Sequence, residues 1–235
     1  MPTLLLRLAG PMQSWGTTSR FDERDTQLEP SKSGVVGLIC AALGRDRAER
    51  VDDLAALRMG VRVDREGLLM RDYQTATGVL IAGSGKADID RTVVSPRYYL
   101  ADAAFLVGLE GPDLEWLSTL KAALRAPHWP VALGRKAFVP ASPVWLDDAP
   151  FHGLHPGRLE DALREQPRIA PPRREQRGQA LRCVLEHLHD GALRHDQPTG
   201  PYLARRFGPR YVVSGVIDHV PEPPAIEPGT PCSPA

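Results

Sequence analysis

The sequence predicts an α+β fold of the ferredoxin-like type, in which strands and helices follow one another as β-α-β-β-α-β, as they also do in RNA-recognition motifs. Two observations support this. The first 125 residues hold strand-like apolar runs separated by two helix-like segments, and the residues after 126 continue with strand-like runs but little helix. We therefore predict a ferredoxin-like domain over residues 1–125, a smaller β-rich C-terminal part over residues 126–219, and a disordered, proline-rich tail over residues 220–235.

The first predicted strand spans residues 3–9, and the glycine and proline at positions 10–11 end it, because proline cannot donate a hydrogen bond to a strand ladder. A helix is predicted over residues 35–43. Ser31 is a suitable N-cap for it, and Gly44 follows its last apolar residue. The helix is apolar on nearly every side, which predicts that it is buried against a sheet.

The start of this helix is a candidate anion site. Ser31, Lys32, Ser33 and Gly34 surround backbone N–H groups that have no partner within the helix, and the helix dipole favours negative charge there. Most capped helices bind nothing, so a purely structural cap is the competing interpretation.

The middle of the first domain predicts a hairpin, a projecting segment and a second helix. Residues 59–64 and 68–75 alternate like two paired strands. Residues 78–97 have no clear period, and we predict a projecting loop or a loose hairpin there. Residues 98–109 return to strand character, and the apolar stripe of residues 114–124 predicts the second helix.

The second half predicts short elements joined by loops. Residues 156–166 suit a short helix with its charges facing outward, and residues 180–188 suit a strand. Residues 191–201 are polar and predict a linker. The last predicted strand spans residues 212–217.

The charge balance excludes a generally basic surface. The chain has 29 Lys and Arg against 29 Asp and Glu, so any contact with nucleic acid must come from a local patch. Its three scattered cysteines predict a reducing, cytoplasmic location without a disulfide framework. No segment predicts a membrane span or a signal peptide.

No metal site or cofactor is predicted. His187 and His189 are two residues apart on one predicted strand, but no third ligand lies near them in the sequence. The segment Gly83–Lys86 lacks the spacing of a phosphate-binding P-loop and does not open a helix.

Cationic residues in loops and at strand ends are the candidates for a local basic patch, because arginine there can bind phosphate in a bidentate manner. Trp15, Tyr73, Tyr98 and Tyr211 are candidates for stacking on unpaired bases. Arginines that are simply solvated are the competing interpretation. The cationic candidates are Arg91, Arg97, Arg135, Lys136, Arg205, Arg206 and Arg210.

A metal-free ribonuclease is an alternative from a different class. It needs a general base and a general acid near a 2′-hydroxyl group. His128, Tyr98, Tyr99 and Lys136 are residues of the right types. A lone histidine or tyrosine beside a strand more often packs or hydrogen-bonds within the fold.

Several stretches together resemble the Cas-five family of CRISPR-associated proteins, in its type I-E Cascade branch. The resemblance covers residues 4–217, and the stretches occur in the order that is typical of the family. The matching stretches are Leu8–Gly16, Pro30–Gly44, Arg71–Thr75, Tyr99–Phe105, Leu133–Lys136 and Arg210–Tyr211.

The resemblance implies a repeat-associated (RAMP) protein with a ferredoxin-like domain, in which residues 78–97 correspond to a projecting thumb. It implies a non-catalytic subunit of the Cascade surveillance complex that binds and caps the 5′ handle of the CRISPR RNA (crRNA). The implied neighbours are a backbone subunit of Cas-seven type and a large subunit of Cas-eight type, and target DNA is engaged through the complex. No cofactor is implied.

Two alternatives remain open beside this resemblance. A sister branch, type I-C, has a catalytic member that uses Tyr, Lys and His, so a metal-independent endoribonuclease for CRISPR repeat RNA is one alternative. A structural adaptor whose thumb only docks on a neighbouring subunit is the other. We predict these RNA-binding residues: Gln13, Trp15, Ser31, Lys32, Ser33, Gly34, Arg91, Arg97, Arg135, Lys136, Arg210 and Tyr211.

Overall fold

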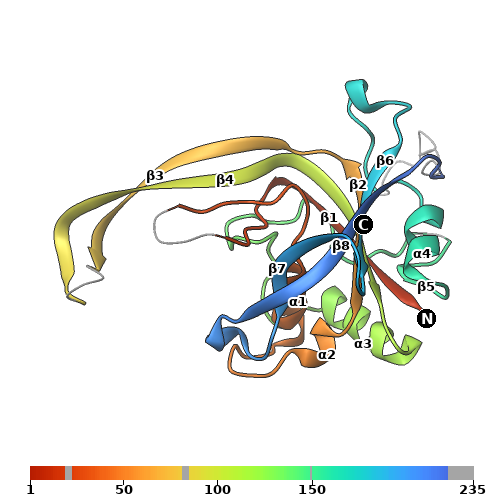
Figure 1. The fold of residues 1–235 in the computed structure, drawn as a ribbon, viewed down its shortest axis with the longest axis horizontal. Helices are drawn as coiled ribbons and strands as arrows, with labels where there is room; N and C mark the ends of the chain where they lie inside the picture. The colour runs from red at the N-terminus through yellow and green to blue at the C-terminus, as the bar shows by residue number, and fades with distance from the viewer. Residues whose placement is uncertain (19–22, 81–84, 149, 222–235) are drawn as a thin grey trace, which may run out of the picture.

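One antiparallel sheet runs through the whole protein. The computed structural model describes residues 1–18, 23–80, 85–148 and 150–221, and over these residues eight strands pair in the order β5-β1-β4-β2-β6-β8-β7, with β3 joined to β4 beside this path (Figure 1). The strands are β1 (Thr3–Gln13), β2 (Arg58–Arg65), β3 (Leu68–Leu80), β4 (Ala87–Glu110), β5 (Leu154–His155), β6 (Leu181–His187), β7 (Ala192–Pro198) and β8 (Phe207–Ile217). The helices are α1 (Lys32–Leu43), α2 (Asp52–Ala55), α3 (Leu114–Arg125) and α4 (Leu159–Glu165), with the short 3-10 helices η1 (Arg174–Gln176) and η2 (Tyr202–Ala204).

Helices cover both faces of the sheet. α1 and α3 lie on one face and enclose the larger core, to which β1 contributes Leu4, Leu6 and Leu8. α4 lies on the other face, where Leu5 belongs to a second buried cluster (Figure 1). Because β1 is buried on both faces, it carries a run of leucines rather than a simple alternation of apolar and polar residues.

The predicted caps of α1 are confirmed. The Ser31 Oγ atom accepts a hydrogen bond from the Gly34 N atom at 3.3 Å. Gly44 adopts a left-handed conformation with φ of 72°, and its N–H group donates to carbonyls of the last turn. Only glycine adopts this conformation without a steric penalty, so the stop signal is local and can be read from the sequence.

β3 and β4 form a long two-stranded ribbon that projects from the body (Figure 1). Their register places Leu80 opposite Ala87 near the far end. A loop over residues 78–97 is therefore wrong, and a hairpin is confirmed for the described part, since residues 81–84 lie outside it. The strand predicted over residues 68–75 lies within β3, but among the described residues β3 pairs with β4 and not with β2, so the hairpin predicted between residues 59–64 and 68–75 is wrong. Most described side chains between residues 76 and 94 are exposed, so no buried face imposes an alternation there that the sequence could display.

The C-terminal strands extend the same sheet, because β6 pairs with β2 over Gly60–Arg62. Strands from both sides of residue 126 thus belong to one sheet, and the domain boundary expected at this residue stays a prediction. The linker predicted over residues 191–201 is wrong, because β7 occupies most of this segment. β7 is an edge strand with many exposed polar side chains, and such a strand resembles a linker in sequence.

The remaining sequence predictions concern the tail and the membrane. Most of the tail predicted over residues 220–235 falls outside the described residues, which end at position 221. Among the residues that are described, no helix is both long enough and apolar enough to cross a membrane.

Candidate nucleic-acid interface

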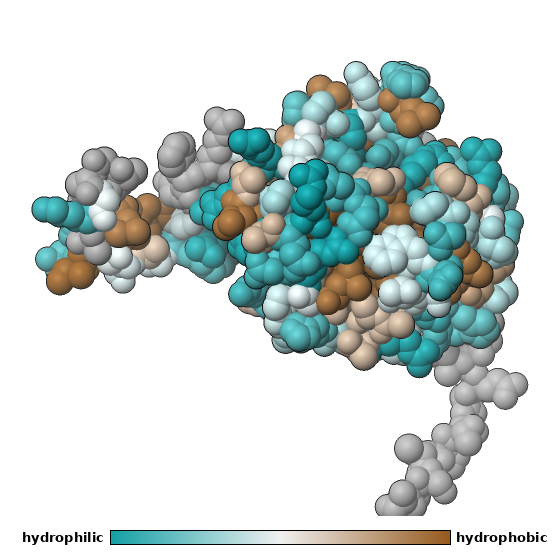
Figure 2. All heavy atoms as spheres, turned by 90° about the horizontal axis from the view of Figure 1, so that it is seen from below, coloured by the Kyte–Doolittle hydropathy of each residue, from teal (hydrophilic) through white to brown (hydrophobic). Residues whose placement is uncertain are grey.

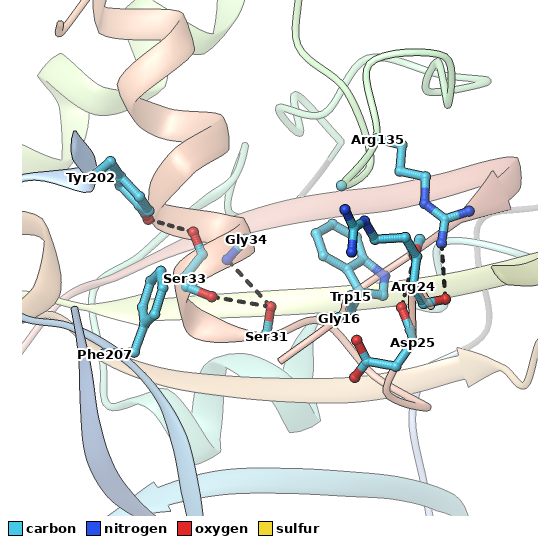
Figure 3. Close-up of a pocket in the computed structure, with 12 residues that line it drawn as sticks. Trp15, Gly16, Arg24, Asp25, Ser31, Ser33, Gly34, Arg135, Tyr202 and Phe207 are labelled. Carbon is cyan, nitrogen blue, oxygen red and sulfur yellow. Dashed lines mark hydrogen bonds between the residues drawn. The ribbon is translucent and has the colours of Figure 1, made fainter. Parts of the chain in front are cut away.

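A cleft of about 280 Å³ opens at the N-terminal end of α1 (Figure 3). Its walls come from the loop after β1, the first turn of α1, the segment around Arg24, the loop that contains Arg135, and the residues around η2. The fold therefore brings together predicted site residues from separate motifs, namely Trp15, Ser31, Ser33, Gly34 and Arg135. It adds residues that were not predicted to form a site, namely Arg24, Asp25, Tyr202 and Phe207.

Trp15 lines the cleft, and the buried Gln13 holds its ring in place. The Trp15 Nε1 atom donates to the Gln13 Oε1 atom at 3.2 Å, and the Gln13 Nε2 atom donates to the carbonyls of Leu8 and Ala103 at 3.0 and 2.9 Å. Both side chains are buried, and a Cβ atom on Gly34 would lie 2.8 Å from the Trp15 ring. These two residues position the helix start, and their predicted role in RNA binding stays a prediction.

The N-terminus of α1 already has an internal anion. The Lys32 backbone N atom donates to the Asp196 Oδ2 atom at 2.8 Å. The Asp196 side chain is buried and supplies the negative charge that the helix dipole favours at this end. The predicted anion seat is therefore occupied from within the chain, and the positive charge of the cleft must come from other side chains.

A buried ionic quartet joins α1 to the C-terminal strands. The Lys32 Nζ atom donates to both oxygens of Glu186 at 2.9 Å, and Arg210 binds the Asp196 carboxylate through its Nε and Nη2 atoms at 2.6 and 2.9 Å. Lys32 and Arg210 are only 1% and 7% exposed. Their charges are satisfied inside the protein, which gives both residues a structural role, and RNA binding by them stays a prediction.

The pKa values of the quartet reflect its burial. Burial is the largest influence on Lys32 and lowers its pKa, although the Glu186 carboxylate raises it. Burial is also the largest single influence on Asp196 and acts to raise its pKa. The hydrogen bonds and charge of Arg210, with further help from the Lys32 amide, outweigh it and hold the pKa of Asp196 below its usual value.

Tyr211 lies on the other side of the sheet from this quartet. Arg210 and Tyr211 fall within β8, where consecutive side chains point to opposite faces. Tyr211 is 40% exposed there. It does not line the cleft, and its predicted role in stacking on RNA stays a prediction for that opposite face.

Three arginines gather beside the cleft, at the root of the ribbon. The Arg24 N atom donates to the Pro96 carbonyl at 3.0 Å and the Tyr98 N atom donates to the Arg24 carbonyl at 2.8 Å, which places Arg24 next to Arg97 on β4. The Arg135 Nη2 atom donates to the Tyr98 carbonyl at 2.8 Å. No pattern in the sequence marks Arg24, because only this backbone pairing brings it to the site.

The Arg135 guanidinium group lies near the positive charges of the other two arginines. Burial lowers the pKa of Arg135 most, and the charges of Arg97 and Arg24 lower it further, while Asp72 and Asp25 oppose them in part. The Arg97 Nε atom is buried without a hydrogen-bond partner in the described part of the chain. Clustered positive charge with an unused donor is what a phosphate group satisfies, so we regard this arginine cluster, Arg24, Arg97 and Arg135, as a candidate phosphate site.

The other predicted contacts spread outward from this cluster. Lys136 is exposed next to Arg135. Arg91 is exposed on the ribbon. It lies about 20 Å from Arg97, because a β-strand rises about 3.3 Å per residue. The Ser33 carbonyl accepts a hydrogen bond from the Tyr202 hydroxyl group, so Ser33 joins the helix start to η2.

The residues considered for a ribonuclease are not assembled. The His128 N atom donates to the Ala42 carbonyl at 2.9 Å, at the C-terminal end of α1. Arg135, the neighbour of Lys136, lines the cleft at the N-terminal end. A helix of this length separates the two by about 18 Å. The histidine and the lysine therefore lie at opposite ends of one helix.

These features define an α+β protein that is built on one antiparallel sheet and has a cationic cleft where the ribbon meets α1. The chain belongs to the Cas5 family: the family described as CRISPR-associated protein (Cas_Cas5) matches residues 3–213.

Individual relatives agree with this family. The chain is 34% identical to the CRISPR system Cascade subunit CasD of Escherichia coli (strain K12) over 163 residues, which are 61% of this chain and 69% of the relative. A solved Cas protein is 48% identical, with a TM-score of 0.75 over 95% of this chain and 100% of that one. A chain from a CRISPR RNA-guided surveillance complex is 32% identical, with a TM-score of 0.70 over 92% of this chain and 90% of that one.

Proposed function

We propose that this protein is a non-catalytic subunit of a type I-E Cascade complex that binds and caps the 5′ handle of the crRNA. The arginine cluster carries the proposal, because Arg24, Arg97 and Arg135 are held close together beside the cleft. Single-stranded RNA offers flexible phosphates that such a cluster neutralises. The chain's overall neutrality suits a subunit that touches few phosphates and many protein neighbours.

The relatives support a place in a larger assembly. The relative from Escherichia coli is a Cascade subunit, and one similar structure belongs to an RNA-guided surveillance complex. On this basis we place the chain in the cytoplasm, beside a backbone subunit of Cas-seven type and a large subunit of Cas-eight type. Target DNA is then recognised by base pairing with the guide, while this subunit holds the backbone of the handle.

The topology supports a ferredoxin-like domain. When β4 is counted as the third strand and β5 as the fourth, the order β5-β1-β4-β2 is fourth, first, third, second. α1 follows the first strand and α3 follows the third, which gives the β-α-β-β-α-β sequence of that fold. Both helices pack on one face of the sheet.

The separation of His128 from Lys136 favours binding over cleavage, because a general base and a general acid must both reach the reacting groups. The test is a nuclease footprint of crRNA in EDTA, on complexes assembled with and without this chain. We expect the 5′ handle to be protected only when the chain is present. We also expect the chain alone to leave precursor repeat RNA intact. If the nuclease cuts the handle equally in both complexes, handle binding by this chain is contradicted. If the chain alone cleaves the repeat RNA and His128→Ala abolishes this cleavage, the ribonuclease is supported instead.

We further propose that the β3–β4 ribbon is the thumb of the family. Apolar side chains stand exposed along it, and they include Leu68, Leu69, Tyr73, Leu80 and Ile89. Figure 2 shows such side chains among the hydrophilic ones on the projecting arm. An isolated two-stranded ribbon is only marginally stable in water, so this arrangement suits docking against neighbouring subunits.

Shortening the ribbon tests this role. Thr77 and Thr92 face each other across it, so replacing residues 78–91 by Asn-Gly closes the ribbon with a two-residue turn. We expect the midpoint of urea unfolding to change little, because those of the removed residues that the structure describes lie outside both buried clusters. We expect assembly with the other subunits to fail in size-exclusion chromatography. Normal assembly of the shortened chain contradicts a docking role.

A further inference from the structure

A second, larger cleft lies beside the first one, on the other side of η2. Its volume is about 540 Å³, within the roughly 300–1,000 Å³ that is typical of ligand sites. It is lined by the end of β7, by α2 and by the turn that joins β7 to β8. No residue lines both clefts, and the turn that carries η2 forms the wall between them.

Two neighbouring residues connect the clefts across this wall. Phe207 lines the first cleft and Arg206 lines the second. The Phe207 ring is 41% exposed and lies 6.3 Å from the Tyr202 ring, so it offers an accessible aromatic face (Figure 3). In a single strand, each base is followed by a phosphate that links it to the next nucleotide. An aromatic ring can stack on the base while a neighbouring arginine binds that phosphate.

Arg206 is the uncompensated cation of the second cleft. The other arginine in its lining, Arg50, is paired with Asp52 at 2.7 Å. Arg206 is exposed, and within the described residues its side chain forms no ion pair or hydrogen bond. The turn around it is fixed, because the Thr199 N atom donates to the Arg206 carbonyl at 3.1 Å. A phosphate that enters the second cleft therefore has one free partner there.

Gln197 supplies an unused acceptor in the same cleft. Its Nε2 atom donates to the Ala55 carbonyl at 2.7 Å, which fixes the orientation of the amide. Its Oε1 atom is buried and has no partner among the residues that the structure describes. A buried acceptor without a donor is costly, so a ligand that donates an N–H group stabilises this site. Nucleobases carry such groups on their pairing edges.

We propose that the second cleft is a separate nucleotide subsite, and that one RNA strand crosses the wall at η2. One base stacks on Phe207 in the first cleft, and the phosphate of the adjoining nucleotide binds Arg206. The base of that nucleotide donates a hydrogen bond to the Gln197 Oε1 atom. This inference rests on the proposed function, since it extends the same RNA strand beyond the arginine cluster.

The test pairs protein variants with a chemical scan of the RNA. Binding of the crRNA's 5′ segment to the full chain is measured while each phosphate in turn is made a neutral methylphosphonate. We expect Arg206→Ala to weaken binding about tenfold and to remove the effect of neutralising one particular phosphate. We expect Arg135→Ala to remove the effect of neutralising a different, neighbouring phosphate. Arg177→Ala, which changes an exposed arginine that lines neither cleft, is the control and should bind like the wild type.

The outcomes separate this inference from the proposed function. If the wild type does not bind the 5′ segment, the proposed function fails. If it binds and Arg135→Ala weakens binding, but Arg206→Ala does not, only the second subsite is overturned. The second subsite is also overturned if Arg206→Ala and Arg135→Ala remove the effect of neutralising the same phosphate, since the strand then occupies a single cleft. A second scan replaces each nucleotide in turn by an abasic one. If one base stacks on Phe207, Phe207→Ala should remove the effect of one abasic replacement. If the effects of Phe207→Ala and of the abasic replacement add at every position, the stacking is contradicted.

Discussion

Replacing Arg24, Arg97 and Arg135 together by alanine is expected to weaken binding of the crRNA handle by at least about 1,000-fold. A hydrogen bond to a charged partner contributes about 1.5–3 kcal/mol when it is well formed, and three such contacts are lost. The slope of log affinity against log salt concentration should also fall by about 2, because each lost phosphate contact on a single strand contributes about 0.7. Fluorescence anisotropy with labelled handle RNA over a salt series measures both quantities.

A matched control removes the same charge elsewhere. Arg164, Arg174 and Arg177 are exposed, and none of them lines the first or the second cleft. Their triple alanine variant should retain most of the affinity and most of the salt slope. If both triple variants lose affinity equally, general electrostatic attraction explains binding, and the arginine cluster has no special role.

Replacing Asp196 by alanine is expected to destabilise the protein by about 3–5 kcal/mol, as removal of one partner from a buried ion pair usually does. The Arg210 guanidinium and the Lys32 amide both lose their acceptor. Urea unfolding followed by circular dichroism measures the free energy of unfolding. The control is Asp52→Ala, which breaks the exposed pair with Arg50 and should cost at most about 1 kcal/mol. Equal losses in the two variants contradict the buried role of Asp196.

The same carboxylate makes a pH-dependent contribution to stability. The folded-state pKa of Asp196 is below its usual value, so its contribution is present above the unfolded-state pKa of about 4. It is lost as the pH falls further and the carboxylate takes up a proton in the folded state. The wild type should therefore lose more stability than Asp196→Ala when both are unfolded at pH values below about 4. Parallel losses in the two proteins contradict this assignment.

Local signals predicted the framework of the fold, and distant pairings determined the site. Ser31 and Gly44 could be recognised as caps because their partners lie within four residues of them in the sequence. Lys32 and Arg210 resemble phosphate ligands in the sequence, because their ion-pair partners Glu186 and Asp196 cannot be identified from the residues near them. Arg24 is the opposite case, because contacts between segments far apart in the sequence bring Arg97 and Arg135 next to it.

Hydrophobic periodicity does not predict strands that lack a buried face. An alternating pattern arises when one face of a strand is buried, and the ribbon leaves most described side chains between residues 76 and 94 exposed. β7 was mistaken for a linker for a related reason, since it is an edge strand with little apolar burial. The arginine cluster could have been found only by knowing that residues 24 and 97 are paired through their backbones.

The crowding of positive charge at the arginine cluster has a consequence for how the subunit is handled in the cell. The charges of Arg97 and Arg24 act on Arg135 within the protein, and a phosphate bound as proposed offsets them, so the proposed RNA binding is thermodynamically linked to folding. We therefore expect the subunit with bound RNA to resist unfolding and proteolysis better than the subunit without it.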